Sequence, residues 1–427
     1  MQIRTKLWIS VGSCVLVGGA SLPLDHHDGL SFFPQAFAQA EGGEGEGGEG
    51  GEGGEGGEGG GVPSSYSLLS KDPNAWSFDA KPQIDGYVDL VRASYVEAAA
   101  QAGKLRAAVG ALLASPSEAS LAAARAAWVA ARPSYLVTET FRFYDGPIEA
   151  VEGRINAWPL NESVIDYVVG NRTAGLINDP GQPVSIEHID AVDQKADEAD
   201  VTTGWHAIEF LLWGQDLSAT GPGARPWTDY VPGQGTNDRR RTYLDLVTQQ
   251  LAADLDSLVA AWDVTDPHSY AARFKSLPQR EALGRMLNGM AILAGFEFMS
   301  ERLTVALDSG DQEDEHSCFS DTTHQDFVYD LVGIERVWSG DGGKHAGLDT
   351  LVGSRDPALK THVDRLLADA KAKVAALGDP WDQVLASPPG STEREAAEAA
   401  VTSLQALGDG LKAAGNKLGV LVLIPTA

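Results

Sequence analysis

The sequence contains very little cysteine, and this excludes a disulfide-stabilised scaffold. Two cysteines occur in 427 residues, and one of them, Cys14, lies in the N-terminal leader. Cys318 is then left without a partner for an intramolecular disulfide. Buried apolar side chains have to hold the fold together, and a hydrophobic fraction of 43% is enough for sizeable cores.

Positive charge is also scarce. The chain has 32 Lys and Arg residues against 60 Asp and Glu residues, which gives a formal net charge of -28. Such an excess of acid argues against binding to nucleic acids or to anionic membrane surfaces. It is compatible with a protein that attracts cations, although bulk acidity does not define a metal site.

Long apolar runs are missing after the leader. No later stretch reaches the roughly 18 to 20 apolar residues that a membrane-spanning helix needs. The sequence therefore predicts that the protein is not an integral membrane protein.

The leader itself, residues 1–40, has the features of a secretory signal peptide. Basic residues precede an apolar run at residues 7–22, and small residues suited to cleavage stand at Ala38 and Ala40. We expect cleavage near one of these two alanines, and export to the periplasm or to a position associated with the outer membrane. Cys14 lies inside the apolar run, which disfavours its use as a lipid attachment site.

Residues 41–63 form a linker that is almost entirely glycine and glutamate up to Gly61. This composition cannot bury apolar area, so it predicts a disordered, self-repelling tether. A chelating role for its carboxylates is the alternative.

The rest of the chain, residues 64–427, predicts an all-α domain. Apolar residues keep helical spacing over long segments, and strand-like alternation is scarce. A segment rich in glycine and proline, residues 216–237, suggests a boundary between a helical half at 64–235 and a second half at 236–427. Helices are expected at about 84–113, 117–143, 238–262, 280–308, 356–377 and 392–420.

The most informative stretch runs from Thr203 to Gly214, residues that can begin and end a helix. Within it, His206 and Glu209 are three positions apart and share one face. The other positions are mostly apolar, which is typical of a helix buried in a bundle. A buried imidazole and carboxylate need partners, and either a metal ion or protein hydrogen bonds could satisfy them.

Two further groups of residues could hold a cation. Glu297 and Glu301 are four positions apart on an expected helix, so their carboxylates can converge, although a solvated pair fits the spacing equally well. Residues 311–326 combine many acidic side chains with His316 and His324. That segment is either a set of hard-cation ligands or an acidic surface loop.

Three phrases of the sequence together resemble the imelysin family. They are residues 154–160, the pattern Gly204-x-His206-x-x-Glu209, and residues 314–321, the last of which looks most like the iron-regulated protein A branch. The resemblance covers most of the chain after residue 84. It implies an all-helical fold of two four-helix-bundle-like halves.

The resemblance also implies a metal site. Its pattern maps onto His206 and Glu209 directly, and Glu139, Glu297 and Glu301 lie in helix phrases similar to those of the family. One histidine with several carboxylates suits iron as well as zinc.

A component of bacterial iron acquisition, acting with a membrane-bound transport partner, is the function that we expect. The alternatives are a metal-dependent peptidase, with Glu209 or Glu301 as its base and the other catalytic residues unknown, and an exported helical module that binds another ligand. No second histidine at helical spacing completes a zinc set of the His-Glu-x-x-His type, which weakens the peptidase interpretation.

Overall fold

The computed structural model describes residues 77–218 and 220–425. The predicted leader and glycine–glutamate linker lie outside these residues and stay predictions. All the described residues fall within one unit, residues 63–427.

The all-α prediction is confirmed. In the described part of the chain no strand occurs, and an isolated β-bridge joins Val168 to Asn171. The α-helices are α1 Lys81–Ala114, α2 Glu118–Leu136, α3 Glu152–Ile155, α4 Glu162–Ile165, α5 Ile186–Val192, α6 Gly204–Trp213, α7 Asn237–Ala261, α8 Tyr270–Ser276, α9 Gln279–Ile292, α10 Val305–Ser309, α11 Thr323–Gly343, α12 Leu348–Arg355, α13 Pro357–Ala375, α14 Asp382–Leu385 and α15 Thr392–Lys417. A π-helix, η5, covers Leu293–Thr304, and short 3-10 helices are η2 Glu139–Phe141, η3 Pro147–Ala150, η4 Trp227–Tyr230 and η6 Gln312–Asp314.

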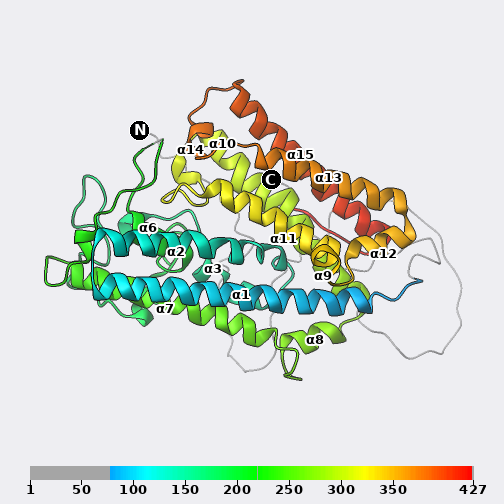
Figure 1. Cartoon of the computed structure of the whole chain (residues 1–427), viewed down its shortest axis with the longest axis horizontal. Coiled ribbons are helices and arrows are strands. Elements are labelled where there is room, and N and C mark those ends of the chain that lie inside the picture. Colours follow the sequence, from blue (N-terminus) through cyan, green and yellow to red (C-terminus); the bar gives the residue numbers. More distant parts are fainter. Residues whose placement is uncertain (1–76, 219, 426–427) are drawn as a thin grey trace, which may run out of the picture. The chain divides into compact units, whose positions relative to one another are not determined.

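The helices pack in groups around their apolar faces. Helix α1 lies beside both α2 and α7, whereas α15 lies beside α13, α9 and η5 (Figure 1). Helix α11 contacts α2 as well as α13 and so links the two groups. By its contacts α7 belongs with α1, although it follows the boundary expected at 235/236; the division of the domain into halves at that position stays a prediction.

The second predicted helix ends earlier than expected. Ser117 caps α2 reciprocally with Ser120, as its Ser-Pro-Ser-Glu context suggests, but the α-helix stops at Leu136, not near residue 143. Pro133 lies one turn before this end, and the Thr138 hydroxyl donates to the carbonyl of Tyr135 at 2.6 Å. The chain then tightens into η2, which carries Glu139.

The segment predicted as one helix at 280–308 consists of three. Helix α9 passes into the π-helix η5, which passes into α10. Wider π-helical turns shift the side-chain register relative to an α-helix, so the spacing of Glu297 and Glu301 no longer places them as neighbours on an α-helical face.

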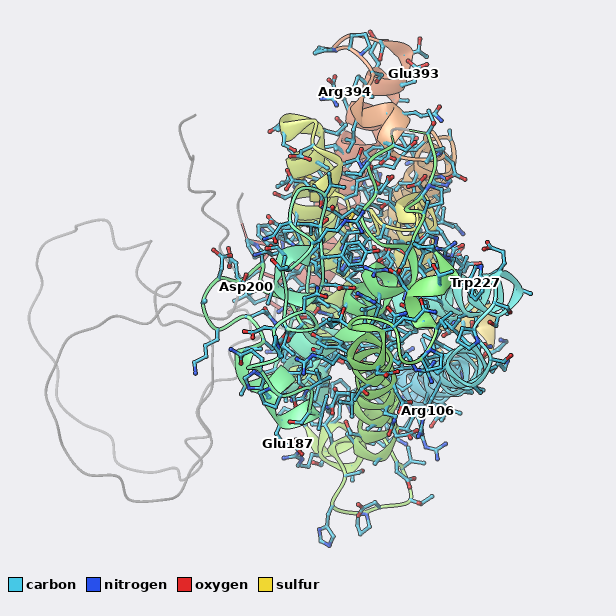
Figure 2. All side chains as sticks on the ribbon, turned by 90° about the vertical axis from the view of Figure 1, so that its left-hand side faces the viewer. Arg106, Glu187, Asp200, Trp227, Glu393 and Arg394 are labelled. Atoms are coloured by element: carbon cyan, nitrogen blue, oxygen red, sulfur yellow. The ribbon has the colours of Figure 1, made fainter. Side chains whose placement is uncertain are left out.

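Several helices were not predicted. Helices α11 and α12 are the longest of them, and the shorter α3, α4, α5, α8 and α14 were not expected either. Helix α15 is capped by Ser391, whose hydroxyl accepts from the amide of Arg394 at 3.2 Å. Glu393 and Arg394 lie in its first turn (Figure 2), and the Arg394 guanidinium donates to the carbonyl of Leu307, which ties α15 to α10.

None of the helices in residues 77–218 and 220–425 is both long and apolar enough to cross a membrane. This agrees with the prediction that the protein is not an integral membrane protein.

Candidate functional site

The start of α6 explains why a glycine begins the motif. Gly204 has a φ of +80°, and a Cβ atom there would lie 2.4 Å from the carbonyl oxygen of Ile155. Thr203 occupies the cap position, but its hydroxyl donates to the carbonyl of Arg154 at 3.1 Å and does not cap the helix as expected. The helix therefore docks directly onto the 154–160 phrase, and only glycine permits this approach.

His206 and Glu209 form a buried hydrogen-bonded pair on α6. The exposed fraction is 2% for His206 and 0% for Glu209, and 2.9 Å separates the His206 Nδ1 from the Glu209 Oε2. The other carboxylate oxygen, Oε1, accepts from the backbone amide of Ser320 at 2.9 Å and from its hydroxyl at 2.6 Å. Both oxygens of Glu209 thus have partners, and the loop before α11 is bound to the motif helix.

The electrostatics of this pair favour a neutral state with one shared proton. Burial raises the pKa of Glu209 to about 8, against the lowering effect of the Ser320 hydrogen bonds. Burial also lowers the pKa of His206 well below its usual range, and the nearby Arg132 guanidinium acts in the same direction. The protonated Glu209 carboxyl then donates to His206 Nδ1, and the neutral ring carries its own proton on Nε2, which is buried and has no hydrogen-bond partner.

A second imidazole, that of His316, lies against the first. The ring centroids of His206 and His316 are 5.0 Å apart. The Nδ1 of His316 lies 2.7 Å from Asp326 Oδ2, and its Nε2 lies 3.4 Å from the amide nitrogen of Asn156. Because the Asn156 oxygen accepts from Arg132 at 2.6 Å, its NH₂ group faces the ring, which makes His316 Nε2 the acceptor and Nδ1–H the donor.

Arg132 is the charged centre of this arrangement and is fully buried. Its guanidinium donates to Asp326 Oδ2 at 3.1 Å and lies 5.4 to 5.8 Å from the ring centroids of Trp128, Trp205 and Tyr135. Aromatic faces stabilise a desolvated guanidinium, and the Asp326 carboxylate balances its charge. The two imidazoles therefore lie in a rigid and largely water-excluded setting.

The remaining predicted residues form a different network around Arg302. Glu139 is fully buried and accepts from Arg302 at 2.5 Å and from Arg142 at 2.6 Å. Burial alone would raise its pKa, but the two guanidinium groups lower it to about 2. Glu297 belongs to the same network, because its Oε1 accepts a hydrogen bond from Arg302 at 3.2 Å. Glu301 is half-buried, and in the described ranges no arginine or lysine forms an ion pair with it.

The five predicted ligands are therefore not found as one cluster. His206 pairs with Glu209, while Glu139 and Glu297 meet at Arg302. Throughout residues 77–218 and 220–425, three or more His, Cys, Asp or Glu ligand atoms lie within 4.8 Å of one another in one place only, at Asp216, Asp321 and Asp382. The metal-binding role of the five residues stays a prediction.

Sequence reasoning missed several residues of the site. For residues 311–326 it left two interpretations open, a set of metal ligands or an acidic surface loop. In the structure His316, Ser317 and Asp326 are buried beside α6. It used the 154–160 phrase as evidence of resemblance without assigning a role to Asn156. The signal was present, since polar residues inside otherwise apolar phrases need partners, but their pairing is not local.

The arrangement of these helices is found in known proteins. A family model described as Imelysin matches residues 91–409. The chain belongs to the imelysin family. The chain is 28% identical over 333 residues to iron-regulated protein A of Synechococcus elongatus, a match that covers 75% of this chain and 82% of the relative.

Solved structures share the imelysin fold. A crystal structure described as an iron-regulated protein A precursor from Parabacteroides distasonis superimposes with a TM-score of 0.64 at 19% identity, over 82% of this chain and 98% of the other. An imelysin-like protein from Psychrobacter arcticum gives a TM-score of 0.57 at 15% identity, over 81% and 99%. At these identities the likeness shows the fold alone.

Proposed function

We propose that this member of the imelysin family is an exported component of bacterial iron acquisition that binds a divalent metal ion, iron or zinc, through His206. Its relative in Synechococcus elongatus carries the name iron-regulated protein A. The strongly acidic chain, with a net charge of -28, favours cation binding over contact with nucleic acid.

The unpartnered Nε2 of His206 carries the proposal. Metal-binding histidines commonly hold their second ring nitrogen against a carboxylate, which fixes the ring orientation and raises the basicity of the ligand. Glu209 contacts Nδ1 and is itself fixed by Ser320. Release of one proton from the pair on metal binding would leave Nδ1–H donating to the Glu209 carboxylate and would free Nε2 for the ion. In this arrangement His206 is the metal ligand and Glu209 orients its ring. Glu209 could bind the ion itself only after losing a hydrogen bond to His206 or to Ser320.

His316 is the best candidate for a second nitrogen ligand. Its Nδ1–H is held by Asp326, so Nε2 has the free lone pair, and the 3.4 Å contact with Asn156 is long for a hydrogen bond. Burial, with the Arg302 and Arg132 guanidinium groups, lowers the pKa of His316 well below its usual range. Both rings are therefore neutral at physiological pH, which is the form that binds a metal.

Burial argues against the peptidase alternative. A metallopeptidase needs an open metal position and space for a peptide carbonyl. His206, Glu209 and His316 are each exposed by no more than 2%. A small ion can reach such a site through local opening, whereas a polypeptide substrate cannot.

Calorimetry with iron(II), under anaerobic conditions, and with zinc(II) tests the metal proposal. We expect binding by the parent protein and its loss in His206→Gln. Glu209→Gln should weaken binding by roughly 10 to 100-fold, the usual effect of removing a group that orients a metal ligand. His268→Gln, which changes an exposed histidine, is the matched control and should bind as the parent does.

Equal binding by the parent, His206→Gln and Glu209→Gln would contradict the site. Absence of binding by the parent protein would favour a module for another ligand. Hydrolysis of peptides by the metal-loaded protein, abolished in His206→Gln, would favour the peptidase.

Export is a separate part of the proposal. Mass spectrometry of the protein recovered from the producing bacterium should give an N-terminus near Ala38 or Ala40 and no lipid on Cys14. An intact leader would contradict export through this signal. Copurification with a membrane-bound iron transporter would support the proposed partner.

A further inference from the structure

A cluster of carboxylates outside the histidine site joins three separate segments. Asp216 follows the end of α6, Asp321 lies in the loop before α11, and Asp382 is the first residue of α14. Each offers one oxygen atom, and these oxygens all lie within 4.8 Å of one another. Carboxylates at such distances repel one another unless a proton or a cation lies between them.

Asp382 is buried in this cluster, with an exposed fraction of 2%, and no amide, hydroxyl or basic side chain donates a hydrogen bond to either of its oxygens. Its side-chain contacts are with the carboxyl groups of Asp216 and Glu315. Asp216 is exposed by 3%; its Oδ1 accepts from the amide of Ser218 at 2.9 Å, and it also contacts the carboxyl group of Asp321. Buried carboxylates that meet mainly one another need a shared proton or a cation between them.

The protein supplies no counter-charge of its own here. In the part of the chain that the structure describes, no lysine, arginine or histidine forms an ion pair with Asp216, Asp321 or Asp382. Burial and the neighbouring carboxylates raise the pKa of Asp216 to about 6 and that of Asp321 to about 8. A fourth acid, Glu315, is exposed by 1% and has a pKa raised well above its usual range by burial and by Asp382.

The donor chemistry selects the class of ion. All ligand atoms of the cluster are carboxylate oxygens, which suit hard cations and not zinc, whose sites in proteins favour nitrogen and sulfur. Calcium accepts six to eight oxygen ligands in a flexible geometry, whereas magnesium requires a near-ideal octahedron and usually keeps several water ligands. Three carboxylates that come from separate segments of the chain therefore suit calcium better than magnesium.

We propose that Asp216, Asp321 and Asp382 form a calcium site, with Glu315 beside it, that clamps the segment after α6 to the loop before α11 and to α14. The ion replaces the repulsion among the carboxylates with three shared contacts. This site is distinct from the proposed iron or zinc site at His206 and does not depend on it.

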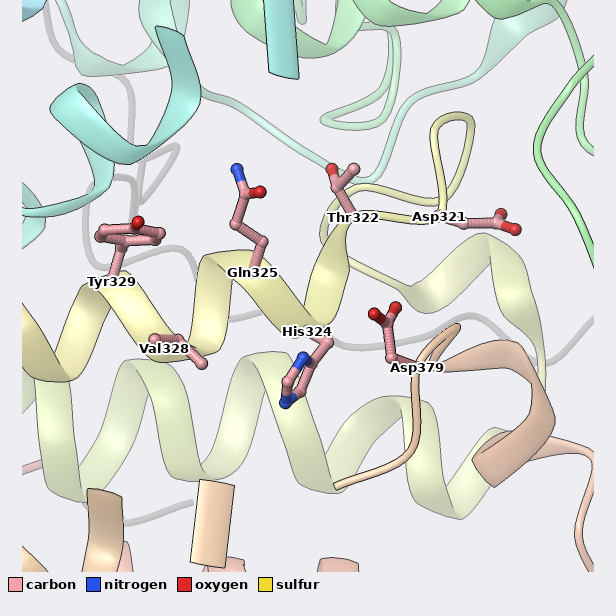
Figure 3. A pocket seen from close by; sticks show the side chains of 7 residues that line it. All are labelled: Asp321, Thr322, His324, Gln325, Val328, Tyr329 and Asp379. Carbon is pink, nitrogen blue, oxygen red and sulfur yellow. The ribbon is translucent and has the colours of Figure 1, made fainter. Parts of the chain in front are cut away.

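Solvent access to the cluster is provided through Asp321. This residue is half-buried and lines a surface pocket of about 290 Å³ together with Thr322, His324 and Asp379. Figure 3 shows Asp321 and Asp379 at one end of the pocket and Tyr329 at the other. A hydrated cation can therefore enter at the acidic end of the pocket and exchange water for the buried oxygens.

Calorimetric titration of chelator-treated protein with calcium chloride at pH 7.5 tests the proposal. We expect one calcium ion per chain in the parent protein and a rise in the midpoint of thermal unfolding. Asp382→Asn and Asp321→Asn should each weaken calcium binding by more than about tenfold, which is the usual effect of changing a residue that only supports a ligand. Both variants should also lose most of the calcium-induced rise in the midpoint of thermal unfolding. Asp256→Asn, on the exposed face of α7, is the matched control and should behave as the parent does.

Absence of calcium binding by the parent protein would overturn the proposal. Unchanged binding in both variants would also overturn it, because the ion would then bind elsewhere, for example on the Gly/Glu linker. If the buried Asp382→Asn variant does not fold, the half-exposed Asp321→Asn variant decides alone. His206→Gln should keep its calcium binding. Asp321→Asn should keep its iron or zinc binding, so failure of one proposed site is distinguishable from failure of the other.

Discussion

The protonated state of Glu209 has a measurable effect on stability. Its pKa is about 8 in the folded chain against 4.5 for the ordinary group. Between these values the folded state keeps a proton that the unfolded state has lost. The stabilisation is fully present below pH 4.5 and is lost as the pH rises through 8. The shift corresponds to ~5 kcal/mol in total, of which ~4 kcal/mol falls between pH 5 and pH 9.

Glu209→Gln removes this titration with little change of shape. The amide can donate to His206 Nδ1 and still accept from Ser320, so at pH 5 the parent and the variant should differ little in stability. At pH 9 the parent carries a buried charge and the variant does not. We therefore expect the free energy of unfolding of the parent, relative to that of the variant, to fall by ~4 kcal/mol from pH 5 to pH 9.

Urea denaturation at pH 5, 7 and 9, followed by tryptophan fluorescence in the presence of a chelator, measures this difference. Other groups with raised pKa values cancel because they are common to both proteins. Glu398→Gln, at an exposed position of α15, is the control. Its free energy of unfolding should change with pH in the same way as that of the parent. Parallel curves for the parent and Glu209→Gln across the whole pH range would refute the neutral, buried carboxyl.

Three further changes test other parts of the structure. Arg132→Met leaves the buried Asp326 carboxylate unpaired, and urea denaturation should show a loss of ~3–5 kcal/mol, whereas Lys373→Met at a surface ion pair should cost less than about 1 kcal/mol. Gly204→Ala forces a side chain into a left-handed backbone against a carbonyl, so we expect a loss of at least ~2 kcal/mol; a variant as stable as the parent would contradict the close approach. Burial raises the pKa of the Cys318 thiol, so in a protein produced without residues 1–40, and hence without Cys14, it should resist a thiol reagent until denaturant is added.

The sequence was most informative where the signals are local. The motif helix was predicted from its end residues and apolar composition, and it begins and ends at Gly204 and Trp213. Helix α11 was missed although Phe327, Leu331 and Ile334 keep helical spacing, because its acidic start resembles a loop. Its last residues have left-handed backbone angles at Gly340 and Gly342, where no apolar periodicity continues.

Charge pairing within the core could not be predicted in the same way. The sequence supplies Glu139 and Glu297 as acidic residues, but it does not reveal that Arg302 lies between them. The π-helical turns of η5 make the pairing harder still to predict. They place Arg302 within hydrogen-bond distance of the Glu297 carboxylate, although the two residues are five positions apart. Propensity and periodicity do not encode such a local change of helix type.

The histidine site shows the same limit more strongly. His206 and Glu209 meet because they are one turn apart, which spacing predicts. His316 reaches them from 110 positions later in the chain, and its supports come from Arg132 and Asn156. Only the packing of α2, α6 and the loop before α11 creates that proximity, and no short pattern contains it.

The distances along the chain between these partners also determine when the histidine site is complete. Ser320 and Glu209 are 111 residues apart, and Arg132 and Asp326 are 194 apart. A chain still emerging from the ribosome, or passing unfolded through a membrane channel, holds α6 without the imidazole of His316 beside it. If the histidine site binds an ion as proposed, that ion would be drawn from the compartment in which folding finishes, whatever metals are abundant where the chain is synthesised.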